Sequence, residues 1–325
     1  MSVLAVDPLV GEQEPQRPVT SVTRGDRIFR ALATACASVS LLIVGATLVF
    51  LVKEAWPALR STGFIHFFTT SEWNPTQGHF GVAGLLIGTI LIAVIAMIVA
   101  VPLAIAMALF INEYSPPRIR RVLTSVVDLL AALPSLLFGL WGFFSLQGRL
   151  IPVARWLADH LSAFPLLRLS RVDARLVQSG FVAGIVVAVM TLPVITSVSR
   201  DVMAQVPREQ CEGALALGGS RWGMIRDVVL PFGRSGIVGA TLLGFGRALG
   251  ETIAVALIIS LVFKPNWHVL ESGAGSIAAL IATRFGEAGP LDRSGLVAAG
   301  LALFVLTLIV NLFARRIVAR AGIKP

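Results

Sequence analysis

Long stretches without charged residues recur along the chain. Five of them contain no Asp, Glu, Lys or Arg and cover 31–52, 80–112, 129–148, 176–199 and 294–314. Each is close to or longer than the about 20 residues that a helix needs to cross the hydrocarbon core of a bilayer. A further apolar run is interrupted by Arg247 and Glu251. The pattern predicts an all-α, polytopic membrane protein whose six transmembrane helices lie at about 31–52, 81–110, 122–145, 178–198, 236–263 and 294–314.

The composition agrees with this prediction and argues against two classes of protein. Hydrophobic residues make up 56% of the chain and charged residues 14%, whereas a soluble domain carries about 25% charged residues. None of the three lysines follows a glycine, so the chain lacks the Gly-Lys-Ser/Thr loop of a P-loop ATPase. The four histidines do not have the spacing of metal ligands, and we expect neither a metal nor another cofactor.

Basic residues are concentrated on one side of the predicted helices. The segments on the side of the two termini hold 16 Lys and Arg residues, and the segments on the opposite side, nearly equal in total length, hold 10. Because loops rich in Lys and Arg stay in the cytoplasm, we expect both termini there, with 1–30 as a flexible tail and 314–325 as a short C-terminal segment. The net charge of +9 then reflects membrane topology and not a nucleic-acid partner.

The cytoplasmic segment 207–231 has the pattern of a helix–turn–helix hairpin. Gly218 and Gly219 can end a first helix in the left-handed conformation, and Ser220 can cap a second helix. We expect this second helix to end at Pro231. From the pattern alone, a hairpin lying on the membrane surface and a docking element for another protein are both open.

The same segment resembles the EAA loop of ABC importer permeases. The resemblance rests on Glu212-Gly213-Ala214, on Gly218 four residues later and on the distal Leu230-Pro231, although Gly213 stands where that family has Ala. It implies a type I ABC importer permease core over about 81–313, preceded by the first helix and its outer loop at 31–80. It also implies that the hairpin docks on a separate ATPase through Glu212, Gly213, Ala214, Leu217 and Gly218.

Four further stretches resemble the PstC family of phosphate permeases. They are Leu130–Ser135, Gly139–Gly142, Met190–Pro193 and, as the most specific, Gly246–Thr252. The resemblance implies a bacterial inner-membrane subunit that imports inorganic phosphate and is not itself an enzyme. It implies a PstA-type second permease, a dimeric cytoplasmic ATPase and an extracytoplasmic phosphate-binding protein as partners, besides the surrounding lipids.

Charged residues within the predicted helices are candidates for the translocation path or gate. An Arg near mid-membrane costs at least about 2.5 kcal/mol on insertion scales, so Arg247 should have a partner. Glu251, four residues later, can touch it on one helix face, but the order Arg before Glu is the weaker one. Arg247 is therefore available to bind an anion or to pair with Asp128. Thr252, which belongs to the same motif, is a further candidate for the path. A purely structural ion pair, with Asp128 as a hydrated interfacial acid, is the alternative.

Small residues recur every fourth position in the predicted fifth helix. Such a stripe predicts close packing against another helix. Its members are Gly236, Ala240, Gly244, Ala248, Thr252, Ala256 and Ser260.

Three other functions compete with a phosphate permease. An ion-coupled secondary transporter needs no ATPase but usually has inverted internal repeats, which the sequence does not reveal. A permease for another oxyanion, such as sulfate or molybdate, would carry the same cytoplasmic loop. A membrane enzyme would need a cluster of reactive side chains at one depth, and the predicted helices contain only Asp128 and Glu251 as acids and no histidine.

Overall fold

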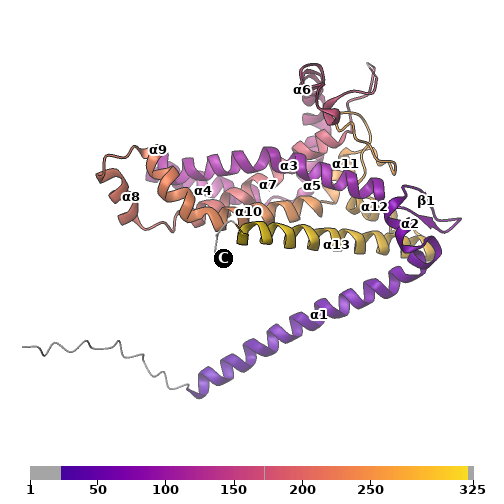
Figure 1. Ribbon diagram of the computed structural model, residues 1–325, viewed down its shortest axis with the longest axis horizontal. Helices are drawn as coiled ribbons and strands as arrows, with labels where there is room; N and C mark the ends of the chain where they lie inside the picture. The colour runs from indigo at the N-terminus through magenta and orange to yellow at the C-terminus, as the bar shows by residue number, and fades with distance from the viewer. Residues whose placement is uncertain (1–22, 172, 321–325) are drawn as a thin grey trace, which may run out of the picture. The chain divides into compact units, whose positions relative to one another are not determined.

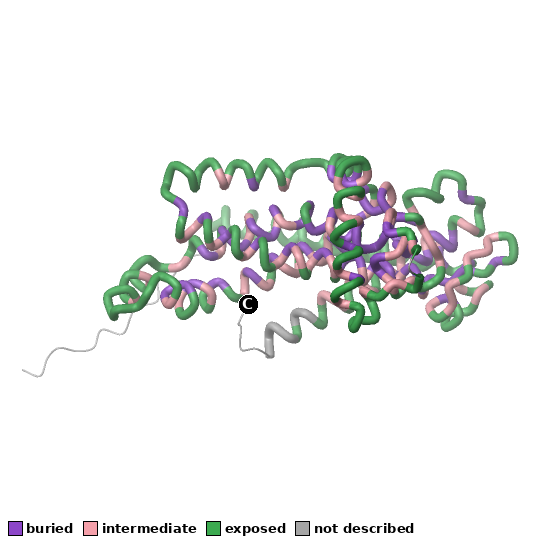
Figure 2. The backbone as a smooth tube through the Cα atoms, turned by 90° about the horizontal axis from the view of Figure 1, so that it is seen from above, coloured by how far each residue is buried: buried purple, intermediate pink, exposed green. Residues whose placement is uncertain are grey.

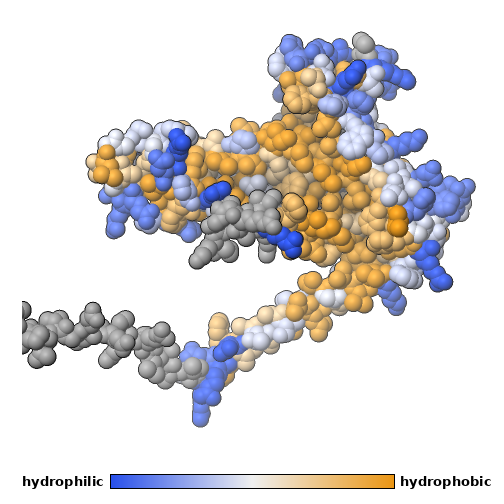
Figure 3. Space-filling view, in the orientation of Figure 1, coloured by the Kyte–Doolittle hydropathy of each residue, from blue (hydrophilic) through white to orange (hydrophobic). Residues whose placement is uncertain are grey.

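The computed structural model describes residues 23–171 and 173–320 of the 325-residue chain. Six helical runs in these residues are long and apolar enough to cross a membrane, which confirms the predicted fold class. They cover Arg24–Thr62, Ala83–Tyr114, Ser135–His160, Gly180–Met203, Arg221–Leu249 and Pro290–Phe313. Over residues 51–320, hydrophobic side chains cover the middle of the bundle and hydrophilic side chains gather at its ends (Figure 3).

The chain divides into two compact units between Phe50 and Leu51, within helix α1 (Arg24–Thr62). Residues 1–22 of the predicted flexible tail lie outside the described residues, whereas the tail from Arg24 onward is already helical. Asp26 lies in the first turn of α1, and its Oδ2 accepts a hydrogen bond from the backbone N–H of Thr23 at 3.0 Å. A carboxylate in this position favours a helix start, so the tail prediction was too long.

A small outer layer follows α1. It consists of α2 (Phe64–Thr69) and a hairpin of strands β1 (Trp73–Asn74) and β2 (His79–Phe80), in which Trp73 pairs with Phe80. Phe67 and Phe80 are fully buried in a hydrophobic cluster with residues of the last helix, α13 (Pro290–Arg320). This layer therefore packs as a satellite core and not as a loose loop.

Three helices form the centre of the bundle: α3 (Ala83–Leu109), α7 (Gly180–Met203) and α10 (Leu230–Leu249). They lie side by side in Figure 1, and Figure 2 shows buried positions alternating with less buried ones along the helices of the bundle. Sixteen of the 24 residues of α7 are buried, which makes it the central helix. The small-residue stripe packs as predicted up to Ala248: a Cβ added at Gly244 would lie 2.6 Å from Ile195 of α7.

The predicted third helix, 122–145, is not continuous. Helix α4 (Pro117–Ala132) ends at Leu133 and Pro134, which are both extended, and α5 (Ser135–Trp141) starts beyond them. The ring of a proline disfavours the helical conformation of the preceding residue, and here the helix that the sequence pattern predicted as one element is broken at Pro134. The membrane-length run instead continues from α5 through the π-helical turn η2 (Gly142–Leu146) into α6 (Gln147–His160).

The segment after α6 returns to the bundle through a 3-10 turn, η3 (Pro165–Leu167), and then enters α7. After α7 comes the predicted hairpin, with α8 (Arg208–Ala216) and α9 (Arg221–Met224) on either side of the glycines. Contrary to the prediction, the second helix does not end at Pro231. It continues through the π-helical turn η4 (Ile225–Val229) into α10. A proline is tolerated here because it lies in the first turn after η4, where the regular helical hydrogen bonds are already interrupted.

The predicted fifth helix, 236–263, is also broken. Helix α10 ends at Leu249, and the short helix α11 (Ile253–Ile258) begins after Gly250 and Glu251. The chain then runs without a helix over 259–276 to α12 (Ile277–Arg284) and α13. Backbone hydrogen bonds from Ser260 and Gly273 to the carbonyl of Gln178 attach this segment to the start of α7.

Candidate functional site

Arg247 and Glu251 do not form the ion pair that a continuous helix would allow. Arg247 lies in the last turn of α10, whereas Glu251 lies beyond the helix end. Arg247 has no ion pair among the described residues, and the residue is half-buried. The expected contact on one helix face was therefore wrong, because the chain leaves the helical path at Gly250.

Glu251 instead stabilises the start of the next helix. Its Oε1 accepts a hydrogen bond from the backbone N–H of Ala254 at 3.2 Å, and the residue is 9% exposed. Thr252, at the first position of this turn, donates its hydroxyl to the carbonyl of Gly250 at 3.0 Å. A broken helix leaves backbone groups unpaired, and in a membrane these groups need such internal partners. Glu251 and Thr252 supply hydrogen-bond partners at the break, and the guanidinium of Arg247 stays available to bind an anion.

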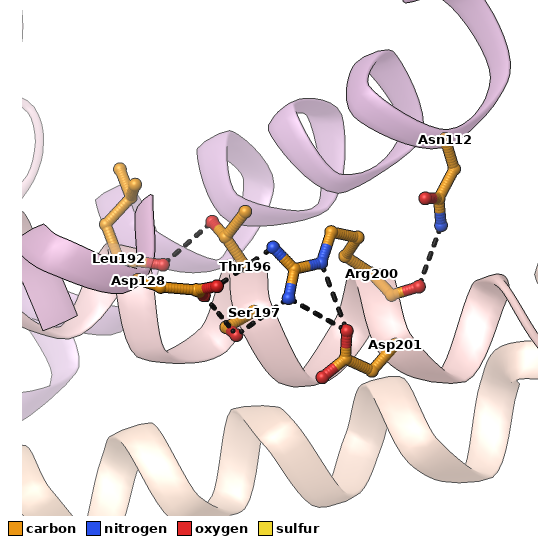
Figure 4. A network of polar contacts seen from close by, with 7 residues as sticks. All are labelled: Asn112, Asp128, Leu192, Thr196, Ser197, Arg200 and Asp201. Atoms are coloured by element: carbon orange, nitrogen blue, oxygen red, sulfur yellow. Dashed lines mark hydrogen bonds and ion pairs between the residues drawn. The ribbon is translucent and has the colours of Figure 1, made fainter. Parts of the chain in front are cut away.

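Asp128 pairs with Arg200 and not with Arg247. Its Oδ1 lies 3.5 Å from Nη1 of Arg200 and accepts a hydrogen bond from the Ser197 hydroxyl at 3.0 Å (Figure 4). Asp128 is on α4, and Ser197 and Arg200 are on α7, so the contact joins two helices. The suggested Asp128–Arg247 pair is therefore corrected.

Arg200 is the functional candidate that the sequence pattern missed. An uncharged stretch ends at residue 199, so the predicted fourth helix, 178–198, leaves Arg200 outside it. In the structure α7 continues to Met203, and Arg200 is buried with an exposed fraction of 8%. The signal that could have found it is the absence of a helix stop, Gly or Pro, between Ser197 and Gln205.

Three neighbours hold the Arg200 side chain and backbone. Its Nε and Nη2 both donate to Oδ1 of Asp201, at 3.1 and 2.9 Å, and Nη2 also donates to the Ser197 hydroxyl at 3.2 Å. Asn112, in the π-helical turn η1 (Phe110–Tyr114) that follows α3, donates its side-chain amide to the Arg200 carbonyl at 2.7 Å. Nη1 is buried without a hydrogen bond and lies 3.5 Å from the Asp128 carboxylate.

The turn η1 is also tied to the start of α4. Arg120 donates from Nε to the carbonyl of Ile111 at 2.9 Å, and from Nη2 to the carbonyl of Asn112. The ends of α3, α4 and α7 thus share one polar cluster, formed by Asn112, Arg120, Asp128 and Arg200.

The hairpin has the predicted glycine turn and cap. Gly218 adopts φ +85°, a left-handed conformation that side chains disfavour. At Gly219 an added Cβ would lie 2.6 Å from the carbonyl oxygen of Ala214, so the second glycine is required by close backbone approach. The hydroxyl of Ser220 accepts the backbone N–H of Gly223 at 3.1 Å and caps α9.

The residues expected to dock on the ATPase lie mostly on the surface of the hairpin. Glu212, Gly213, Leu217 and Gly218 are exposed and Ala214 is half-buried. Leu217 is 90% exposed at the end of α8, and a large apolar side chain in this position is typical of an interaction surface. Nothing in the structure tests a contact with the ATPase, so the docking role of the hairpin stays a prediction.

Side-chain contacts fix the hairpin to the end of α3. Arg221 of α9 donates to the carbonyl of Glu113 at 3.2 Å, and its guanidinium lies 5.7 Å from the ring centre of Tyr114. On α8, burial raises the pKa of the Cys211 thiol, and the carboxylates of Glu113 and Glu212 raise this pKa further. The hairpin is therefore packed against η1 on one side and open on the other.

The sequence matches one family of membrane proteins over most of its length. The profile described as "Binding-protein-dependent transport system inner membrane component" matches residues 100–323. The chain is 42% identical over 298 residues to the phosphate transport system permease protein PstC 2 of Mycobacterium tuberculosis, which covers 90% of this chain and 92% of that protein. It is 36% identical over 302 residues to the phosphate transport system permease protein PstC of Xylella fastidiosa, with 93% of each chain covered.

The fold is similar to that of solved ABC transporters. A chain of the bacterial alginate ABC transporter, solved with its alginate pentasaccharide-bound periplasmic protein, superposes with a TM-score of 0.61 at 17% identity and covers 91% of this chain and 96% of that one. A second structure of a bacterial alginate importer gives a TM-score of 0.57 at 16% identity, with 90% and 99% covered. At this identity the likeness concerns the fold alone, and it confirms the ABC permease architecture.

Proposed function

Because the chain belongs to the family of binding-protein-dependent transport system inner membrane components, we propose that it is the permease subunit through which an ABC importer carries inorganic phosphate into the cytoplasm. The observation that carries the proposal is the identity of 36 to 42% to PstC proteins over about nine-tenths of both lengths. Family membership and the six apolar helices make it a multi-pass inner-membrane protein. They also argue against an ion-coupled secondary transporter.

Three partners complete the proposed importer. A PstA-type permease would pair with this chain in the membrane, a dimeric cytoplasmic ATPase would bind the hairpin, and an extracytoplasmic phosphate-binding protein would deliver the anion. The exposed Leu217 and the exposed Trp222 of the adjoining helix support a partner at the hairpin. With the hairpin in the cytoplasm, both termini lie there as well, which agrees with the excess of Lys and Arg on that side.

We place the phosphate path at the break between α10 and α11. Arg247 is half-buried there without a carboxylate partner among the described residues, and a guanidinium matches the geometry of phosphate oxygens. Broken helices at membrane depth line substrate paths in other transporters. Glu251 and Thr252 would keep the break open, and Asp128 would act at the cytoplasmic side of the path. The chain performs no covalent chemistry in this scheme, and ATP hydrolysis takes place on the ATPase.

Substitution of Arg247 tests this path. In proteoliposomes that contain the permease pair, the ATPase and the binding protein, Arg247→Gln should abolish ATP-dependent uptake of radiolabelled phosphate while the complex still assembles. Arg247→Lys is the matched control, because it keeps the charge and loses only the planar fork, and it should retain part of the uptake. Unchanged uptake by an assembled Arg247→Gln complex would remove Arg247 from the path.

Competition among oxyanions tests the substrate. Unlabelled phosphate should suppress the uptake of labelled phosphate, whereas sulfate and molybdate at the same concentration should not. Strong suppression by sulfate or molybdate would make that anion the substrate in place of phosphate. The assignment of the chain as an ABC permease would not change.

A further inference from the structure

Arg200 lies where α7, α4 and η1 meet, eight residues before the docking helix α8 (Figure 4). We propose that Arg200 and Asp128 form a latch between α7 and α4 that opens and closes during transport, and that Asp201 keeps the charge of Arg200 paired while the latch is open. Arg200 is then a positioning residue that controls when α4 can leave α7. The inference rests on the proposed function, since a latch of this kind has a purpose only in a transporter that changes conformation.

The two carboxylates around Arg200 are held in different ways. Asp201 is the next residue on the same helix and accepts two hydrogen bonds from the guanidinium, whereas Asp128 comes from another helix and is joined by a longer contact of 3.5 Å. A buried charge that loses its only partner is strongly destabilising. Because Asp201 moves with Arg200, separation of α4 from α7 would not leave the buried guanidinium unpaired.

The solvent exposure of the three side chains also favours a change of the carboxylate that pairs with Arg200. The Arg200 side chain is 10% exposed, while those of Asp128 and Asp201 are 49% and 63% exposed. Asp128 can therefore be hydrated as soon as it is released, whereas Arg200 needs a protein partner in both states. The flanking carboxylates also make the cluster a poor binding site for an anion such as phosphate.

The element that can move is α4. Val127 is its one buried residue, whereas most of α7 is buried. At its far end α4 stops at the extended residues Leu133 and Pro134, where rotation about the backbone can redirect a helix. A lightly packed helix with such an end needs a specific contact to hold it, and the Asp128–Arg200 contact supplies one.

Two side chains connect the latch to the hairpin. Arg221 of the hairpin bonds the carbonyl of Glu113 and lies against Tyr114, and Asn112 of the same turn bonds the carbonyl of Arg200. Movement of the hairpin would thus displace η1 and pull on the end of α7. Coupling between distant sites travels through contiguous contacts of this kind when an element with two arrangements lies between them.

Two asparagine variants with opposite expected effects test the latch. In proteoliposomes that contain the full complex, Asp128→Asn weakens the cross-helix contact, so ATP hydrolysis in the absence of phosphate should rise about two- to fivefold, the range for a partly exposed ion pair. Asp201→Asn leaves Asp128 as the only carboxylate beside Arg200 and tightens the latch. It should slow phosphate uptake by a similar factor without raising phosphate-free hydrolysis. Asp159→Asn, at an exposed acid of α6, is the matched control and should change neither rate.

A purely structural role gives a different result. If Asp128 and Asp201 only stabilise the fold, both variants lower the yield of assembled complex and change phosphate-free hydrolysis in the same direction, which would overturn the latch. Uptake of phosphate by the unsubstituted complex, measured in the same vesicles, tests the proposed function separately. Its absence would refute phosphate import, whereas normal uptake with no opposite effects of the two variants would refute the latch alone.

A reversible cross-link tests the opening directly and does not depend on the asparagine variants. In a background with Cys36→Ser and Cys211→Ser, Asp128→Cys and Ser197→Cys place one thiol on each helix, at positions whose side-chain oxygen atoms lie 3.0 Å apart in the unsubstituted chain. A short bis-methanethiosulfonate reagent, which forms one disulfide with each thiol and releases methanesulfinate, should join α4 to α7 and reduce ATP-dependent uptake at least tenfold. A reductant that cleaves these disulfides should restore uptake. Uptake at the uncross-linked rate by fully cross-linked protein would show that this contact never has to open.

Discussion

Two glycines of the hairpin 207–231 should respond in opposite ways to the same substitution. Gly218 has φ +85°, and a Cβ added there would meet no atom within 4 Å. The penalty of Gly218→Ala is therefore that of the left-handed backbone alone, about 1–2 kcal/mol for an L-residue. The population of the open hairpin should rise by about 5- to 30-fold.

Gly213 lies inside α8 and also has no atom within 4 Å of an added Cβ. Alanine is favoured over glycine in a helix interior by about 0.8–1 kcal/mol. Gly213→Ala should therefore decrease opening of the hairpin by about fivefold. Gly218→Asn serves as a matched control, because asparagine tolerates the left-handed conformation better than alanine does, and it should open the hairpin less than Gly218→Ala.

Hydrogen exchange in the assembled complex and in the free subunit measures this opening directly. The peptide that contains the amides of Leu217, Gly218 and Gly219, which bond back to α8, should lose protection in Gly218→Ala and gain it in Gly213→Ala. ATP-driven uptake should fall only in the first variant. Equal changes of protection in both variants, or a Gly218→Ala hairpin as protected as the original, would refute the assignment of a left-handed turn to this position.

Two further outcomes follow from packing and charge. A Cβ at Gly88 would overlap the backbone of Gly275, so Gly88→Ala should lower the unfolding free energy by about 1–3 kcal/mol. Gly239 has open space around it, so Gly239→Ala should not lower the unfolding free energy. Thermal unfolding in detergent checks both variants. Burial raises the pKa of Cys211, and Glu212 raises it further, so alkylation of this thiol should require a higher pH than that of a free thiol. Glu212→Gln should shift the alkylation profile to lower pH, and an unchanged profile would contradict a charge effect of Glu212.

The hydrophobic pattern was sufficient for the number of the spanning helices and for the approximate positions of four of them. Uncharged runs such as 80–112 and 294–314 correspond to continuous helices because a bilayer leaves few alternatives to a helix. The glycine turn at Gly218 was also predictable, because glycine readily adopts the conformation with positive φ that ends a helix.

Helix breaks within apolar runs were not predictable from hydrophobicity. Pro102 and Pro193 lie inside α3 and α7 without ending these helices, whereas Pro134 lies at the break between α4 and α5. At Gly250 the break depends on Glu251, which pairs with a backbone N–H three residues later. Such pairing is visible only in three dimensions.

The partner of Asp128 could not be found along the sequence for the same reason. Asp128 and Arg200 are 72 positions apart, and their contact depends on how α4 lies against α7. The sequence pattern identified Asp128 as unusual because a charge within an apolar helix is costly. It offered Arg247 as a partner because that residue was the one basic side chain within the predicted helices.

The most direct test of phosphate import is uptake by the purified, reconstituted complex. The account predicts that vesicles with this chain, the second permease, the ATPase and the binding protein accumulate radiolabelled phosphate only when ATP is present on the ATPase side. Accumulation should stop when the ATPase is replaced by a variant that binds ATP without hydrolysing it. Phosphate accumulation by this chain alone, driven by a proton gradient and without the ATPase, would contradict the account.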